Sequence, residues 1–140
     1  MNTSKFISHS EEETKSFAAK FAGGLQGKEK ICLIGPFGAG KTTFVRGFVS
    51  AFGIDPRSVQ SPTFTLVREY GSEKKIYHVD LYRFEKEADI IEAGIHELLG
   101  SDELVLIEWA DRLNLYFPKD SVQLYFDHAE GNDRVIEWSR

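Results

Sequence analysis

The chain has 140 residues, of which 41% are hydrophobic and 28% charged, an ordinary composition for a globular protein, and we expect one domain over residues 1–140. The net charge of −5 and the lack of a basic cluster argue against direct binding of DNA or tRNA, so any contact with nucleic acid should be made through a partner. No segment approaches the roughly eighteen apolar residues of a membrane span, and no secretory signal precedes the chain, so we expect a cytoplasmic protein without membrane contact.

Cysteine and histidine give no indication of a disulfide or a zinc site. The single cysteine, Cys32, lies in the apolar run ICLI, where we expect a small buried side chain rather than redox chemistry. The four histidines, His9, His78, His96 and His128, are scattered without the spacing of metal ligands.

The first predicted element is an amphipathic helix that follows Ser10. Ser10 and Glu13 have the spacing of a capping box, and an apolar stripe with helical spacing follows them. Gly23 and Gly24 are expected to end this helix.

A strand, a glycine-rich loop and a second helix are predicted next. Residues 30–34, KICLI, form a nearly continuous apolar run, which is typical of a strand covered on both faces. From Lys41 onward, Phe44 and Phe48 repeat at helical spacing until Gly53 ends the run. The loop therefore joins a buried strand to an amphipathic helix.

Two β-rich runs, residues 63–70 and 75–82, flank the turn GSEK and predict a hairpin. Alternation in the second run separates an apolar face from a polar face. The apolar face carries Tyr77, Val79 and Leu81, and the polar face carries His78, Asp80 and Tyr82.

The remaining residues predict one helix, one strand and a closing hairpin. Residues 88–99 have helical spacing weakened by Gly94, and residues 103–109, ELVLIEW, resemble a second buried strand. Residues 121–128 and 133–139 flank the turn AEGN and predict the hairpin.

The loop sequence GPFGAGKTTF fits the pattern G-x-x-x-x-G-K-[ST] through Gly35, Gly40, Lys41 and Thr42. Glycines let the backbone curl so that its N–H groups point inward, and the helix that follows adds the positive end of its dipole. Lys41 would reach the β- and γ-phosphates of a nucleotide, and the Thr42 hydroxyl would bind Mg²⁺. A chance match on an ordinary glycine turn occurs in about half a per cent of chains this long.

A P-loop NTPase also needs an acidic group at the end of a neighbouring strand. Glu108 follows four apolar residues, and Asp80 lies on the polar face of its strand, so we favour a functional role for both over solvated strand-end acids. Trp109 fits either a core position, which is slightly favoured, or a place against the nucleotide. Thr43 could bond the α-phosphate.

The expected nucleotide is ATP, because neither Asn114 nor Asn132 opens the N-K-x-D segment of guanine-specific proteins. Arginines are dispersed rather than clustered in a lid, which favours transfer of the phosphoryl group to water over transfer to a metabolite. A small-molecule kinase and a nucleotide-dependent binding module with negligible hydrolysis remain the alternatives.

Four blocks, GPFGAGKTTFVRGF, SPTFTLVREY, YHVDLYR and LIEWADRL, together resemble the TsaE family, the small ATPase of bacterial tRNA threonylcarbamoyladenosine synthesis. The resemblance covers roughly residues 31–113, and unrelated P-loop proteins share only the first block. The predicted fold is α/β, a three-layer P-loop NTPase-like fold with a mixed, largely parallel sheet flanked by helices, plus β-hairpins.

The motif and the resemblance together assign functional residues. The predicted nucleotide-binding residues are Gly35, Gly38, Ala39, Gly40, Lys41, Thr42, Thr43, Asp80 and Trp109. The predicted catalytic residues are Lys41, Asp80 and Glu108, and those for Mg²⁺ are Thr42 and Glu108.

The resemblance also implies roles for segments without a fixed motif. Hydroxyls of Ser61, Thr63 and Thr65, with Pro62 between them, match a switch-like segment that senses the γ-phosphate, although a capped turn before a strand is an equal alternative. Residues before the first helix and near Arg134 would close the adenine pocket.

The partners implied by the resemblance are proteins of the TsaB and TsaD type, which transfer threonylcarbamoyl to the adenosine beside the anticodon. Hydrolysis of ATP to ADP would reset that complex, and tRNA would be contacted only indirectly. We expect feeble turnover by the isolated chain and stimulation on docking.

The loop departs from the family pattern at two positions. Pro36 stands where the family usually has an acidic residue, and Phe37 where it has a leucine. Proline removes one N–H and restricts Gly35 to extended conformations. We expect nucleotide binding to survive, because the N–H donors of residues 37–42 remain.

Overall fold

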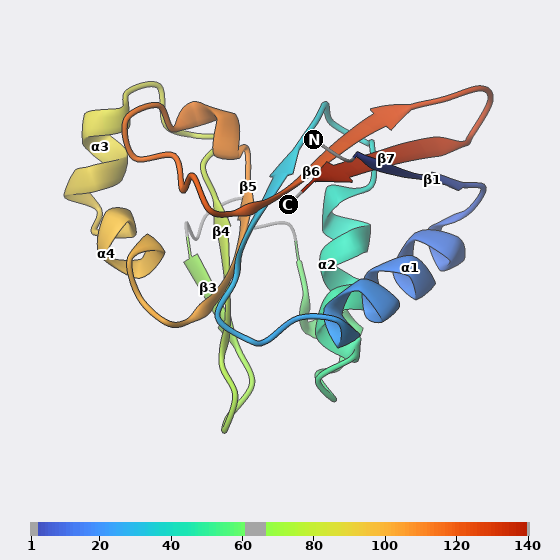
Figure 1. Cartoon of the computed structure of the whole chain (residues 1–140), viewed down its shortest axis with the longest axis horizontal. Helices are drawn as coiled ribbons and strands as arrows, with labels where there is room; N and C mark the ends of the chain where they lie inside the picture. Colours follow the sequence, from blue (N-terminus) through green and yellow to red (C-terminus); the bar gives the residue numbers. More distant parts are fainter. Residues whose placement is uncertain (1–2, 61–66, 140) are drawn as a thin grey trace.

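The computed structural model describes residues 3–60 and 67–139, which form a mixed β-sheet between two layers of helices (Figure 1). In this part of the chain the strands follow the order β1-β7-β6-β2-β5-β4-β3. They are β1 (Ser4–Ser8), β2 (Lys30–Ile34), β3 (Val67–Tyr70), β4 (Ile76–Asp80), β5 (Leu104–Glu108), β6 (Val122–His128) and β7 (Arg134–Ser139).

Helices cover both faces of the sheet. On one side lie α1 (Glu11–Gly23) and α2 (Lys41–Ser50), and on the other lie α3 (Glu87–Glu92) and α4 (Ile95–Leu99) (Figure 1). Short 3₁₀ turns, η1 (Pro56–Ser58) and η2 (Ala110–Arg112), follow α2 and β5. The predicted three-layer α/β architecture is confirmed.

The centre of the sheet is parallel. Strand β2 pairs in parallel with β5 and with β6, and β4 pairs in parallel with β5. Strands β3, β7 and β1 are added in antiparallel fashion, which confirms the hairpin of β6 and β7 and, over the described residues, that of β3 and β4. Every residue of β5 is buried, as expected of a central strand covered on both faces.

Alternation along the strands divides the apolar side chains between two cores. Leu104 and Leu106 of β5 join the core under α1 and α2, whereas Val105 and Ile107 join the core under α3 and α4. Because successive side chains point to opposite faces, Glu108 continues the row of Leu104 and Leu106. The last residue of β5 is therefore directed to the α2 side of the sheet.

The start of α1 follows the predicted capping pattern. The Ser10 hydroxyl accepts a hydrogen bond from the Glu13 N–H at 3.1 Å, and the helix ends at Gly23. The Glu13 carboxylate accepts from the N–H of His9 rather than that of Ser10, at 3.3 Å. These bonds satisfy N–H groups that have no partner inside the helix.

Cys32 is fully buried, as predicted. Its thiol donates to the Ser121 hydroxyl at 3.4 Å, and burial raises its pKa to about 11. A thiol with such a pKa is a poor nucleophile, which agrees with a packing role.

The secondary structure differs from the predictions in three places. The helix expected over residues 88–99 is two short helices, because Gly94 adopts φ +84° and interrupts the backbone path between α3 and α4. Strand β1 was not predicted, because a short edge strand whose side chains are mostly exposed carries little pattern of its own. Helix α2 ends at Ser50, a turn before Gly53.

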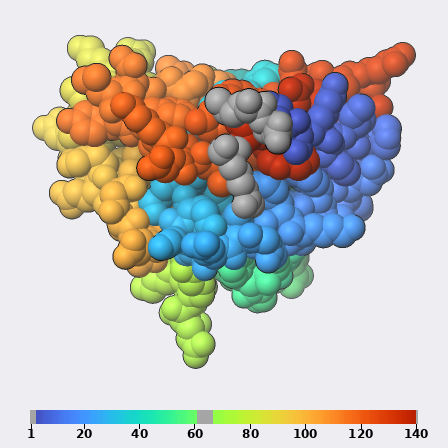
Figure 2. Space-filling model, viewed as in Figure 1, coloured from blue at the N-terminus to red at the C-terminus, as the bar shows by residue number. Residues whose placement is uncertain are grey.

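The turns of the two hairpins project from the body at separate corners of the molecule (Figure 2). The β3–β4 turn, in yellow-green, extends downward, and the β6–β7 turn, in red, extends to the upper right. Among the described residues, no helix is long and apolar enough to cross a membrane.

Helices α1 and α2 are in close contact at Gly47. A side-chain carbon at Gly47 would overlap the carbonyl oxygen of Lys15 in α1. Although alanine favours helix by about 1 kcal/mol over glycine, we expect Gly47→Ala to lower the free energy of unfolding by about 1–3 kcal/mol, because rigid backbone blocks the added methyl group. Urea denaturation measures this change.

The matched control is Gly23→Ala at the end of α1, where nothing lies within 4 Å of the added carbon. This variant should be neutral or slightly stabilised. A Gly47→Ala protein as stable as Gly23→Ala would contradict the close packing of the two helices.

Candidate functional site

The loop between β2 and α2 begins at Gly35 and takes a path that requires glycine. Gly38 and Gly40 have φ of +74° and +103°, a region that L side chains rarely adopt. Gly40 caps α2, and its carbonyl accepts from the Phe44 N–H at 2.9 Å. The loop thus ends at the N-terminus of a ten-residue helix, where amide groups and the helix dipole present positive potential.

Two side chains of the β6–β7 hairpin hold the loop from outside. His128 donates from Nε2 to the carbonyl of Phe37 at 3.0 Å, and Arg134 donates from Nε to the carbonyl of Gly38 at 2.9 Å. Arg134 therefore lies beside the loop, and the part in closing the adenine pocket that the resemblance implies for this region stays a prediction. His128 was missed, because nothing in the sequence relates its register on β6 to the loop.

Lys41 lies inside the site and is only 6% exposed. Its ammonium group donates to the carbonyl oxygens of Gly35 and Pro36, and it lies 3.9 Å from the centre of the Trp109 ring. Burial lowers the pKa of Lys41, and the negative charges of Glu108 and Asp80 oppose that shift. A partly desolvated ammonium group interacts more strongly with an anion than one in water.

The two predicted carboxylates are brought together by the sheet. Asp80 ends β4 and Glu108 ends β5, and the two residues are direct partners in the parallel register. Burial raises the pKa of Asp80, and the negative charge of Glu108 raises it further. The Tyr82 N–H, which donates to Oδ1 of Asp80 at 2.9 Å, lowers this pKa and so opposes the other two effects. Glu108 itself is only 4% exposed.

A buried hydrogen-bonded chain runs from Glu108 into the sheet. The Oε2 atom of Glu108 lies 2.6 Å from Nε2 of His78, and Nδ1 of His78 lies 3.1 Å from the Tyr70 hydroxyl. His78 is fully buried. Sequence analysis placed His78 on the same face as Asp80 but gave it no partner, and Tyr70 was missed.

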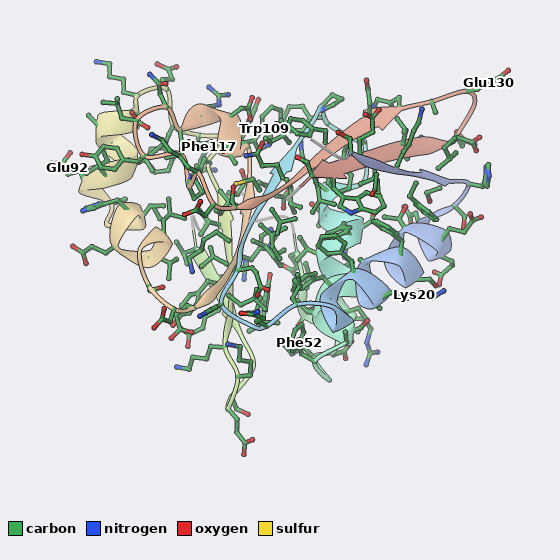
Figure 3. All side chains as sticks on the ribbon, viewed as in Figure 1. Lys20, Phe52, Glu92, Trp109, Phe117 and Glu130 are labelled. Carbon is green, nitrogen blue, oxygen red and sulfur yellow. The ribbon has the colours of Figure 1, made fainter. Side chains whose placement is uncertain are left out.

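Trp109, directly after Glu108, has a left-handed backbone with φ 58° and ψ 38°. It lies at the upper edge of the sheet, beside the ends of β5 and β2 (Figure 3). The ring contacts those of Phe37 and Tyr82, with centroids 5.0 and 5.2 Å away, and we call these three residues the aromatic patch. The ring also packs against the core under α3 and α4, so the slightly favoured core interpretation describes only part of its surroundings.

The remaining predicted residues fall into two groups. Ala39 is buried and its N–H donates to the Pro36 carbonyl at 3.4 Å, while Thr42 and Thr43 lie half-buried in the first turn of α2. The predicted switch-like residues Ser61, Pro62, Thr63 and Thr65 lie outside the described residues.

The oxygen atoms at the site suit Mg²⁺ more than a transition metal. A hydroxyl at Thr42 and carboxylates at Asp80 and Glu108 are hard ligands, and Mg²⁺ is usually held by one or two carboxylates together with substrate phosphates. The described residues contain no group of three His, Cys, Asp or Glu side chains able to hold a metal ion by themselves. The donor set therefore fits a metal ion that binds together with a phosphate ligand.

The backbone of Trp109 provides a test of strain at the site. A left-handed conformation costs a non-glycine residue about 1–2 kcal/mol, so Trp109→Gly should be more stable than Trp109→Ala by about 1 kcal/mol in denaturant unfolding, although both lose the ring. At Asp111, which has negative φ, the order of the glycine and alanine variants should reverse. Equal stability of the two Trp109 variants would exclude strain at this position.

Comparison with known proteins agrees with this geometry. The family model described as "Threonylcarbamoyl adenosine biosynthesis protein TsaE" matches residues 8–136. The relative named tRNA threonylcarbamoyladenosine biosynthesis protein TsaE in Bacillus subtilis is 36% identical over 129 residues, which cover 91% of this chain and 80% of the relative. The relative of the same name in Rickettsia bellii is 39% identical over 136 residues, which cover 96% and 94% of the two chains.

The fold is also found in a solved structure. The crystal structure of YdiB from Bacillus subtilis matches with a TM-score of 0.79 and 28% sequence identity, over 98% of this chain and 84% of that one. The family match includes the glycine-rich loop, both strand-end carboxylates and the hairpin side chains that hold the loop. On these grounds the chain belongs to the TsaE family.

Proposed function

We propose that this chain binds ATP with Mg²⁺, hydrolyses it slowly to ADP, and acts with partner proteins of the TsaB and TsaD type in threonylcarbamoyladenosine modification of tRNA. The names of the relatives support the pathway. One arrangement carries the nucleotide part of the proposal. Lys41 lies in a glycine-rich loop at a helix N-terminus, beside the carboxylates of Asp80 and Glu108.

The loop supplies the phosphate contacts in this proposal. Amides at the start of α2 and the Lys41 ammonium group donate to phosphate oxygens, and the low exposure of Lys41 strengthens its interaction with them. His128 and Arg134 donate hydrogen bonds to carbonyl oxygens of the loop. They therefore hold the loop and leave its amide N–H groups available to phosphate.

Thr42 and Glu108 would hold Mg²⁺ through their side-chain oxygens. When bound, this ion neutralises negative charge on the transferring phosphoryl group. Asp80, whose pKa is raised by burial, lies next to Glu108 at the strand ends and can accept a hydrogen bond from the attacking water.

Slow turnover by the isolated chain follows from where its cations lie. Phosphoryl transfer depends mostly on positioning and on stabilising negative charge. Arg46 donates to the Val59 carbonyl and Arg134 to the Gly38 carbonyl, while the Arg112 guanidinium lies 5.9 Å from the Trp109 ring. Each of these three arginines already has a contact within the chain, so a partner is the proposed source of a further cation.

The surface beside the site supports docking of a protein rather than of tRNA itself. Phe37 and Tyr82 of the aromatic patch are 62% and 45% exposed, and aromatic residues are enriched at protein interfaces. The net charge of −5 disfavours direct contact with the tRNA backbone.

Binding of MgADP and MgATP by calorimetry tests the first step. Lys41→Ala should weaken the affinity by about 10- to 100-fold, because a charge-assisted hydrogen bond to phosphate is lost. Lys20→Ala, at an exposed position of α1, is the matched control and should bind as the wild-type chain does. Absence of binding heat for folded wild-type protein would contradict the proposal.

Release of phosphate from ATP tests hydrolysis and its dependence on partners. We expect turnover to rise when a protein pair of the TsaB and TsaD type is added, and Glu108→Ala to lower stimulated turnover by about 100-fold. Equal turnover with and without the pair would contradict the partner role. Phosphorylation of a nucleoside or sugar in place of phosphate release would favour a metabolite kinase, and binding without hydrolysis would favour a binding module.

A further inference from the structure

The buried chain formed by Tyr70, His78 and Glu108 connects the candidate metal site to the interior of the sheet. Each member comes from a different strand, β3, β4 and β5, which lie side by side. All three side chains are on the α2 side, since Ile76 of β4, Tyr70 of β3 and Leu106 of β5 belong to the core under α1 and α2. None of the three is more than 7% exposed.

The hydrogen bonds of this chain determine where the imidazole proton lies. A carboxylate only accepts hydrogen bonds, so Nε2 of His78 must carry the proton that is donated to Oε2 of Glu108 at 2.6 Å. The Tyr70 hydroxyl can then donate to Nδ1, which lies 3.1 Å away. With this assignment, both ring nitrogens of His78 and the hydroxyl of Tyr70 each take part in a hydrogen bond.

The backbone of Glu108 is fixed independently of this chain. The Glu108 carbonyl accepts from the Leu81 N–H at 3.1 Å, and the N–H of the next residue, Trp109, donates to the Leu33 carbonyl at 3.2 Å. The ladder therefore fixes the main chain of Glu108, but it leaves the carboxyl group free to rotate about its side-chain bonds. The hydrogen bond from His78 restrains the carboxyl group.

In the described part of the chain, Glu108 and Lys41 form no direct ion pair, although their opposite charges attract each other. The short bond to His78 engages Oε2, and Oε1 takes no part in it. The carboxylate is thus held from behind by the imidazole of His78, and Oε1 stays available to a cation in front.

We propose that His78, supported by Tyr70, is a positioning residue that orients the Glu108 carboxylate for Mg²⁺. The inference rests on the proposed function, since it assigns a role toward the metal ion that accompanies the nucleotide. Side chains behind a metal-binding carboxylate or imidazole commonly affect metal affinity by about 10- to 100-fold when they are replaced. The alternative is a chain that only satisfies buried polar atoms and contributes to stability.

The coupling between Mg²⁺ and nucleotide separates these two roles without measuring turnover. The quantity is the ratio of the ADP dissociation constants without and with Mg²⁺, obtained by calorimetry. His78→Leu should reduce this ratio by about tenfold, because the carboxylate loses its orientation, while ADP alone should bind within about threefold of wild type. Tyr70→Phe, which leaves the Nε2 bond in place, should reduce the ratio by less.

Conservative replacement provides the rescue. A glutamine amide carries N–H donors at about the reach of imidazole Nε2, so His78→Gln should restore the ratio to within about threefold of wild type. Two control variants should leave the ratio unchanged. They are His96→Leu, at a histidine of α4 outside the site, and Ile90→Val, a destabilising change in the core beside α3. Equal loss in the leucine and glutamine variants, or loss in the Ile90→Val control, would overturn the positioning role.

Nuclear magnetic resonance on the wild-type chain tests the proton assignment even where a variant fails to fold. Long-range ¹H–¹⁵N spectra should show a proton on Nε2 of His78, and His78→Gln identifies its signals among the four histidines. Absence of a proton on Nε2 would overturn the proposal. The absence of ADP binding by wild-type protein would instead refute the proposed function, so the two failures are distinguishable.

Discussion

The parallel pairing of β2, β5 and β4 is the constraint on which the candidate site depends. Parallel strands end at the same edge of a sheet, so the loop after β2 and the last residues of β4 and β5 meet there. The register makes Asp80 and Glu108 direct partners. A shift of one residue would exchange the side chains of β5 between the two cores and turn Glu108 to the other face of the sheet, so the candidate site depends on this register.

Burial of charge is the second feature that organises the site. Lys41 and Glu108 are 6% and 4% exposed, and a buried charge is costly unless hydrogen bonds compensate it. The two charges are compensated separately, since Lys41 donates to loop carbonyls and Glu108 accepts from His78. Each group thus keeps its charge at the same edge of the sheet, which is the arrangement that a metal-bound polyphosphate requires.

Much of the fold and part of the site could be predicted from local patterns. The capping residues of α1, the buried strands β2 and β5, the glycine-rich loop and the two faces of β4 all follow from spacings within a few residues. Local patterns were insufficient where tertiary context decided the outcome. Gly94 separates α3 from α4 instead of weakening one helix, and β1 exists because β7 offers an edge for pairing.

The sequence by itself determined which reactive residue types the candidate site contains, because Lys41, Thr42, Asp80 and Glu108 stand in the patterns that the proposed binding of phosphate and Mg²⁺ requires. Only the tertiary structure decided which groups surround them. Tyr70 and His78 reach Glu108 across three strands, and Arg134 and His128 reach the loop from a hairpin about ninety residues further along the chain. Such contacts depend on strand order and register, which are set by long-range pairing and leave no local periodicity in the sequence.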